Sequence, residues 1–153
     1  LEAFLGADAH WLAESRAICT YLEGSYPEPN LMGTTAEERA FIEMADRQVE
    51  FHLLATIANF VRHTHPGLLA LENPQFPDFG AAQAKKMLEY AALFDARLAS
   101  RPWMAGDRFT IADITAFCGI EFARLVKFKP GDAGLTHLAA WRDRVAERPS
   151  ARV

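Results

Sequence analysis

The segment that decides the fold is WMAGDRFTIAD at residues 103–113. It contains the residues of a complete helix-capping motif, which fixes where a loop ends and a helix begins. Thr110 can cap the helix with its hydroxyl, and Asp113, three residues further on, can accept a hydrogen bond from the amide of the cap. Phe109 precedes the cap and can pack on Ile114 as a hydrophobic staple. We therefore interpret Phe109, Thr110 and Asp113 as a structural cap, with no catalytic role for the carboxylate.

The helix that follows this cap also indicates its own place in the fold. It is expected to end near Val126, and its apolar residues occupy most of its circumference: Ile111, Ile114, Phe117, Cys118, Ile120, Phe122 and Leu125. A helix that is apolar on most sides has to be enclosed by other elements. We expect it to be the central helix of a helical domain.

The rest of the chain from Thr35 onward has a helical pattern and no convincing strand. Thr35 and Glu38 form a second capping-box pattern, which predicts the start of a long helix that reaches about His63. Apolar residues recur along it at every fourth position: Phe41, Ala45, Val49, Leu53, Ile57 and Val61. This spacing predicts one buried face.

Two further helices complete the predicted domain. Prolines at positions 66, 74 and 77 interrupt the pattern, and a second amphipathic helix is expected from about Phe79, packed antiparallel against the first. Its buried side would carry Ala84, Leu88, Ala91 and Leu98. The last helix would carry Leu138, Trp141 and Val145 and stop before Pro149.

The N-terminal part of the chain has a different pattern. A strand end, a turn at Gly6-Ala7-Asp8 and a short strand at residues 10–12 are expected, followed by a helix that Ser15 caps and that extends through Leu22. The prolines in YPEPN at residues 26–30 end this helix and make the best linker candidate. The predicted fold is therefore mainly α, with a remnant of an α/β unit at 1–26, a linker at 27–34 and an all-helical domain at 35–153.

The composition excludes several classes of function. The 16 basic and 20 acidic residues give a net charge of −4, and no basic run is present, so we expect no nucleic-acid partner. The longest mostly apolar stretch, residues 51–61, is too short to span a membrane, which needs roughly 20 residues. Cys19 and Cys118 fall on apolar helix positions and are expected to be buried free thiols in a reducing cytoplasm.

Glu14 and Ser15 form the strongest candidate binding site. A helix start offers free amides and a positive dipole end to an anion, and Ser15 adds a hydroxyl, while Glu14 can accept from an ammonium group. The alternative is that Ser15 is an ordinary helix cap, because serine is among the commonest capping residues. A metal site at His63-Thr64-His65 is not expected, because no cysteine or carboxylate ligands are spaced around it.

Taken in order, the motifs resemble those of the cytosolic glutathione transferases of bacterial type. The similar segments are LAESRAICTYLE at 12–23, YPEPNL at 26–31, FTIAD at 109–113, and 138–150 with its RPS ending. The resemblance implies a thioredoxin-like domain, of which 1–26 is the last part, followed by the helical domain of this family. It also implies that the catalytic Tyr, Ser or Cys lies before Leu1, so we expect no catalytic residue in this chain and no activity from the fragment alone.

The resemblance further implies the chemistry and the partners. Glutathione would be a substrate, held by Glu14 and Ser15, and no metal would be needed. An electrophile pocket is expected around His52, Ala55, Thr56 and Asn59; the alternative is that these are ordinary surface or core groups. The protein would be a cytoplasmic homodimer that uses its long helix as part of the interface. A rival interpretation is a non-catalytic module with the same fold, used for protein assembly or ligand binding.

Overall fold

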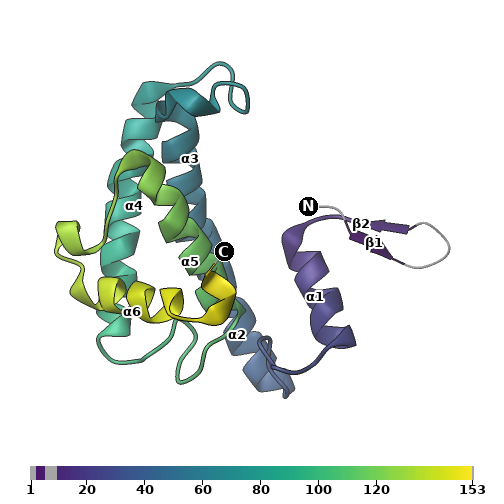
Figure 1. The fold of residues 1–153 in the computed structure, drawn as a ribbon. Helices are drawn as coiled ribbons and strands as arrows, with labels where there is room; N and C mark the ends of the chain where they lie inside the picture. The colour runs from purple at the N-terminus through teal and green to yellow at the C-terminus, as the bar shows by residue number, and fades with distance from the viewer. Residues whose placement is uncertain (1–2, 6–9, 153) are drawn as a thin grey trace.

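The computed structural model describes residues 3–5 and 10–152. Two short strands, β1 (Ala3–Leu5) and β2 (His10–Leu12), pair antiparallel with Leu5 opposite His10. The strand predicted at 10–12 is confirmed, and the turn predicted at Gly6-Ala7-Asp8 lies outside the described residues. Helix α1 (Ser15–Ser25) follows and extends three residues beyond the predicted end. In Figure 1 the hairpin and α1 lie to one side of the remaining helices.

The long predicted helix is present, but it contains a change of helix type. It consists of α2 (Ala36–Gln48), the π-helical segment η1 (Val49–Leu54) and α3 (Ala55–Thr64). Four of its apolar positions, from Val49 to Val61, are at most 1% exposed, whereas Phe41 is 56% exposed. The expectation that Phe41 is buried is wrong, because no described helix covers this side of α2.

Helix α4 (Pro77–Leu98) lies beside α3, and the two are joined through the short 3-10 turn η2 (Pro66–Leu68) (Figure 1). The helix begins two residues before the predicted start, because a proline fits the first turn of a helix. Met87, Ala91 and Phe94 form its buried face, whereas Leu88 is 46% exposed. The prediction for Leu88 is wrong because this residue follows Met87 around the helix and faces away from α3.

Helix α5 (Ile111–Ala123) packs against α2, η1 and α3, as expected of a central helix. The short turns η3 (Arg124–Val126) and η4 (Gly131–Ala133) lead to α6 (Thr136–Ala146), which contacts α4 and α5, and η5 (Pro149–Ala151) follows. The predicted apolar face of α6 is confirmed, since Leu138 and Trp141 are fully buried and Val145 is 2% exposed.

One side of α5 is nevertheless open. Ile114 and Cys118 are exposed on it, because α5 is covered by other helices on only part of its circumference, and Leu125 of η3 is exposed as well. Both cysteines are free, but Cys19 is only half-buried and Cys118 is exposed, so the prediction that both are buried is wrong.

The mainly α prediction is confirmed. One core joins α2 to α6, and in the described part of the chain the only strands are those of the hairpin. Within the same part, no helix combines the length and apolarity needed to cross a membrane.

Candidate functional site

The start of α1 has an unusual backbone. Glu14 stands directly before the helix at φ +69° and ψ +116°, a conformation that residues other than glycine rarely adopt. Such conformations cost about 1–3 kcal/mol and cluster at ligand-binding sites. The Glu14 carbonyl accepts from the Ile18 amide at 3.0 Å, so the helix begins at Ser15. The prediction that Ser15 is the cap is therefore wrong.

The backbone at the start of α1 leaves the polar groups of Glu14 and Ser15 accessible to a ligand. Glu14 occupies the cap position without a capping hydrogen bond from its side chain. Both Glu14 and Ser15 are exposed. The first amides of a helix have no partner within it, so the amide of Ser15 and the two that follow are free to face an anion. The geometry thus presents a carboxylate, a hydroxyl and helix amides side by side.

Arg16, the next residue, attaches α1 to the helical domain. Its guanidinium pairs with Glu43 and lies 3.4 Å from the carboxylate of Asp46, which has no exposed surface. Asp46 also accepts from Arg47 at 2.8 Å and from the Thr115 hydroxyl at 2.6 Å. Burial lowers the pKa of Arg16, and the charge of Asp46 opposes this shift. A single buried carboxylate on α2 therefore connects α1 with α5.

Sequence reasoning missed this network. Arg16 and Asp46 are 30 positions apart and Thr115 lies a further 69 away, so no local pattern links them. The only available signal is that Asp46 stands next to Ala45 on the buried side of a helix, where a charge requires a partner.

The segment between α1 and α2 is held by the carboxylate of Glu23. Its Oε1 accepts from the Asn30 side chain at 2.6 Å and from the amides of Leu31 and Met32 at 3.0 and 2.9 Å. Leu31 in turn accepts from the Ile111 amide at the start of α5, at 3.1 Å. The predicted linker is therefore bound to the helices on both sides.

The four residues predicted to line an electrophile pocket lie on η1 and α3. His52 is exposed, and its ring stacks on Tyr90 with the centroids 4.7 Å apart. Ala55 and Asn59 are half-buried. Thr56 is buried, and its hydroxyl donates to the carbonyls of His52 and Leu53. Of the three polar residues, His52 and Asn59 are thus better placed than Thr56 to meet a ligand.

The predicted structural cap of α5 is present. The Asp113 carboxylate accepts from the amides of Thr110 and Met104 at 3.0 and 2.9 Å, and from the indole of Trp141 at 2.8 Å. Burial raises the pKa of Asp113, and these three N–H groups oppose the shift. Phe109 packs edge-on against Trp103 and lies under the guanidinium of Arg148.

Two expectations concern this region and metal binding. Ile114, the predicted partner of Phe109 in the staple, is 39% exposed, and the contact between them stays a prediction. Among the described residues, no group of three or more histidines, cysteines or carboxylates is arranged to hold a metal ion.

Comparison with known proteins gives one consistent family. Residues 63–149 match the family model described as the C-terminal domain of glutathione S-transferase. Glutathione S-transferase 2 of Saccharomyces cerevisiae is 35% identical over 146 residues, which cover 95% of this chain and 62% of the yeast protein. The chain thus spans less than two thirds of that relative. Elongation factor 1-gamma of Schizosaccharomyces pombe is 33% identical over 90% of this chain and 33% of its own length.

Solved structures agree with this result. A glutathione S-transferase domain-containing protein from Marinobacter aquaeolei VT8 superposes with a TM-score of 0.89 at 39% identity, over 98% of this chain and 73% of that one. The fold, the order of the motifs and the family model all indicate the same family. The chain belongs to the glutathione S-transferase family, of which it carries the helical C-terminal domain.

Proposed function

We propose that the protein containing this chain is a glutathione transferase, which transfers the glutathione thiolate to a small, mostly apolar electrophile. The observation that carries the proposal is the start of α1, where Glu14 and Ser15 are exposed beside helix amides that have no partner within the helix. The γ-glutamyl end of glutathione has a carboxylate and an ammonium group. The carboxylate suits the helix start, and Glu14 suits the ammonium.

The chemistry requires one further group, which holds the glutathione thiol as the thiolate. A free thiol near pKa 8.5 is only a few per cent ionised at neutral pH, so the enzyme has to favour the thiolate. We assign that task to the part of the protein before Leu1. The role of this chain is to hold one end of glutathione and to present His52, Ala55 and Asn59 to the electrophile, with the buried Thr56 behind them.

The protein is proposed to act as a cytoplasmic homodimer. Three large apolar side chains on α2 and η1 are exposed: Phe41 at 56%, Met44 at 50% and Phe51 at 62%. A group of exposed apolar side chains on one continuous helix, here α2 and η1, is typical of an interface between subunits. A second copy of the chain is the partner of this surface.

A conjugation assay tests the proposed activity. The full-length protein should couple glutathione to a small aromatic electrophile, and Glu14→Ala and Ser15→Ala should each raise KM for glutathione. Glu89→Ala, which changes an exposed carboxylate on α4, is the matched control and should behave as the unmodified protein. Absence of conjugation with a panel of electrophiles would contradict the proposal.

A second candidate is a non-catalytic assembly module, favoured by the similarity to elongation factor 1-gamma. The two functions differ in one residue that lies outside this chain. A Ser, Tyr or Cys able to stabilise a thiolate in the upstream domain supports the enzyme, whereas an inert residue there supports the module.

A further inference from the structure

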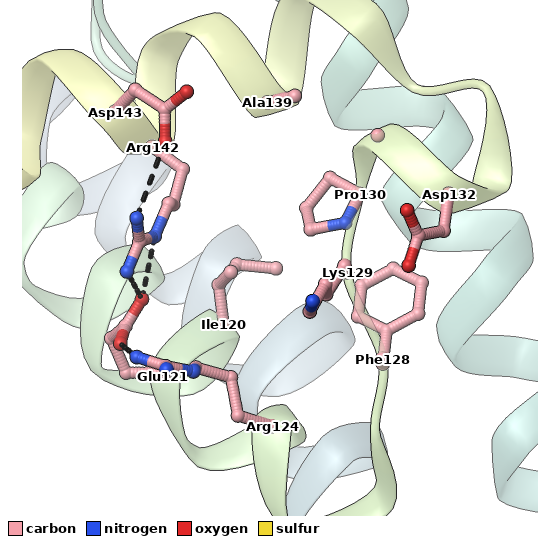
Figure 2. Close-up of a pocket in the computed structure, with 11 residues that line it drawn as sticks. Ile120, Glu121, Arg124, Phe128, Lys129, Pro130, Asp132, Ala139, Arg142 and Asp143 are labelled. Carbon is pink, nitrogen blue, oxygen red and sulfur yellow. Dashed lines mark hydrogen bonds and ion pairs between the residues drawn. The ribbon is translucent and has the colours of Figure 1, made fainter.

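A cavity of about 350 Å³ lies between the end of α5, residues 128–132 and α6 (Figure 2). No residue of α1, of the linker or of η1 lines it, so it is separate from the proposed glutathione site. Its charged groups come from two opposite walls, and an apolar floor lies between them.

The wall formed by α5, η3 and α6 is an ion-pair network that is already complete. Glu121 accepts from Arg142 at 2.6 and 2.7 Å and from Arg124 at 2.8 Å, and Arg142 also reaches Asp143 at 3.2 Å (Figure 2). Burial would raise the pKa of Glu121, but the two arginines outweigh it and hold that pKa below its usual value. The charges of this wall therefore neutralise one another.

The opposite wall holds two charged residues, Lys129 and Asp132, both of which are exposed. Among the described residues, neither the Lys129 ammonium nor the Asp132 carboxylate has an ion-pair partner. Figure 2 shows both on the side of the cavity opposite Glu121 and Arg142. This wall thus offers one free positive and one free negative group to the same cavity.

The backbone keeps this wall in place without a ligand. The Asp132 amide donates to the Lys129 carbonyl at 3.1 Å, and the Leu135 amide donates to the Pro130 carbonyl at 3.0 Å. The Phe128 amide donates to the last residue of α5, Ala123, at 3.2 Å. A site whose backbone is fixed in this way loses little conformational entropy when it binds.

The floor between the walls is apolar. Ile120 is 1% exposed at its base, Phe128 packs against the core, and Ala139 and Pro130 complete the lining. Pockets of this volume suit small molecules when an apolar surface lies beside polar groups that set the orientation of the ligand.

We propose that this cavity binds the zwitterionic head of an α-amino acid with an apolar side chain. The ligand carboxylate meets Lys129, its ammonium meets Asp132, and its side chain rests on Ile120 and Ala139. Each free charge of the wall then gains a partner of opposite sign, and the apolar part of the ligand leaves water.

Three related probes test the proposal on the full-length protein. L-leucine carries both charges, 4-methylpentanoate lacks the ammonium, and 3-methylbutylamine lacks the carboxylate. Methyl NMR signals of Ile120 and Ala139 report the binding of each. Leucine should shift both signals saturably, and each analogue should bind about threefold to fivefold more weakly, since it forms one solvent-exposed ion pair fewer.

Two variants assign the contacts. Lys129→Gln should weaken leucine and 4-methylpentanoate and leave 3-methylbutylamine unchanged, and Asp132→Asn should weaken leucine and the amine only. Lys86→Gln, an exposed lysine of α4, is the control and should change nothing. Three probes of equal affinity, no saturable shift with leucine, or leucine binding that survives both variants would each overturn the proposal.

Glutathione carries the same head group at its γ-glutamyl end and is the fourth probe. Saturation of the Ile120 and Ala139 signals by glutathione but not by leucine would overturn the assignment to an amino acid. This readout does not depend on conjugation activity, so the proposed function and this site can fail separately.

Discussion

The indole nitrogen of Trp141 donates to the carboxylate of Asp113 at 2.8 Å, and neither residue has any exposed surface. Because Asp113 also accepts from Met104 and Thr110, one side chain joins the loop before α5, the start of α5 and the middle of α6. The carboxylate is thus a structural junction of the domain.

Replacing Asp113 should therefore be severely destabilising. Asp113→Ala leaves three buried N–H groups without an acceptor, at about 1–3 kcal/mol each, and we expect a loss of about 3 kcal/mol or more of unfolding free energy. Asp113→Asn should lose less, because one oxygen remains. Urea unfolding measures both, with the exposed Asp107→Ala as control. An equal, small effect of all three changes would contradict the junction.

The stability of the domain should depend on pH in the acid range because of Glu38. A hydrogen bond from the Thr34 amide, with those from Arg108 and the Thr34 hydroxyl, lowers its pKa from 4.5 to about 2. A carboxylate with a depressed pKa in the folded state stabilises the fold above its unfolded pKa, and this contribution is lost as the pH falls towards the folded value.

The Glu38→Gln variant tests this dependence. The unmodified protein should be the more stable of the two at neutral pH, and the difference should shrink between pH 4.5 and about 2. Urea midpoints followed by circular dichroism across this range measure the difference. A gap between the two proteins that is independent of pH would contradict the assignment.

Asp46 should position the glutathione site without touching the ligand. Asp46→Asn weakens the attachment of Arg16, so the amides of α1 should exchange hydrogen faster and glutathione affinity should fall by about threefold to tenfold. Glu50→Gln is the control, because Glu50 also pairs with Arg47 but lies on η1. Unchanged exchange in α1 would show that Asp46 does not hold this helix.

The dimer interface can be tested by adding a charge to it. Phe51→Glu places a carboxylate at an exposed apolar position of η1 and should shift the protein towards monomer in light scattering. Leu69→Glu changes a similarly exposed side chain, at 52%, beyond the end of α3 and should leave the mass unchanged. A monomeric unmodified protein would contradict the proposed homodimer.

Local sequence signals predicted the parts of the fold that depend on neighbouring residues. The cap at Thr110 and Asp113 follows from side chains within one helical turn, and the buried face of α6 follows from helical spacing. Both features involve residues within one or two helical turns. They could therefore be deduced without knowing the tertiary structure.

The features that were missed depend on distant contacts or on backbone detail. The π-helical segment η1 has no composition that marks it, and the exposure of Phe41 depends on which side of α2 is covered. Because Glu14 has a positive φ, the cap of α1 is Glu14 and not the predicted Ser15. The bonds from Arg16 and Thr115 to Asp46 join three helices, which no single pattern contains.

Calorimetric titration of the full-length protein with glutathione and with cysteinylglycine tests the central claim most directly. Because the dipeptide lacks the γ-glutamyl group, we expect glutathione to bind and cysteinylglycine to bind at least tenfold more weakly. Glu14→Ala and Ser15→Ala should reduce this preference. Equal binding of the two ligands, or a preference that both variants leave intact, would contradict the assignment of the α1 start as the γ-glutamyl site.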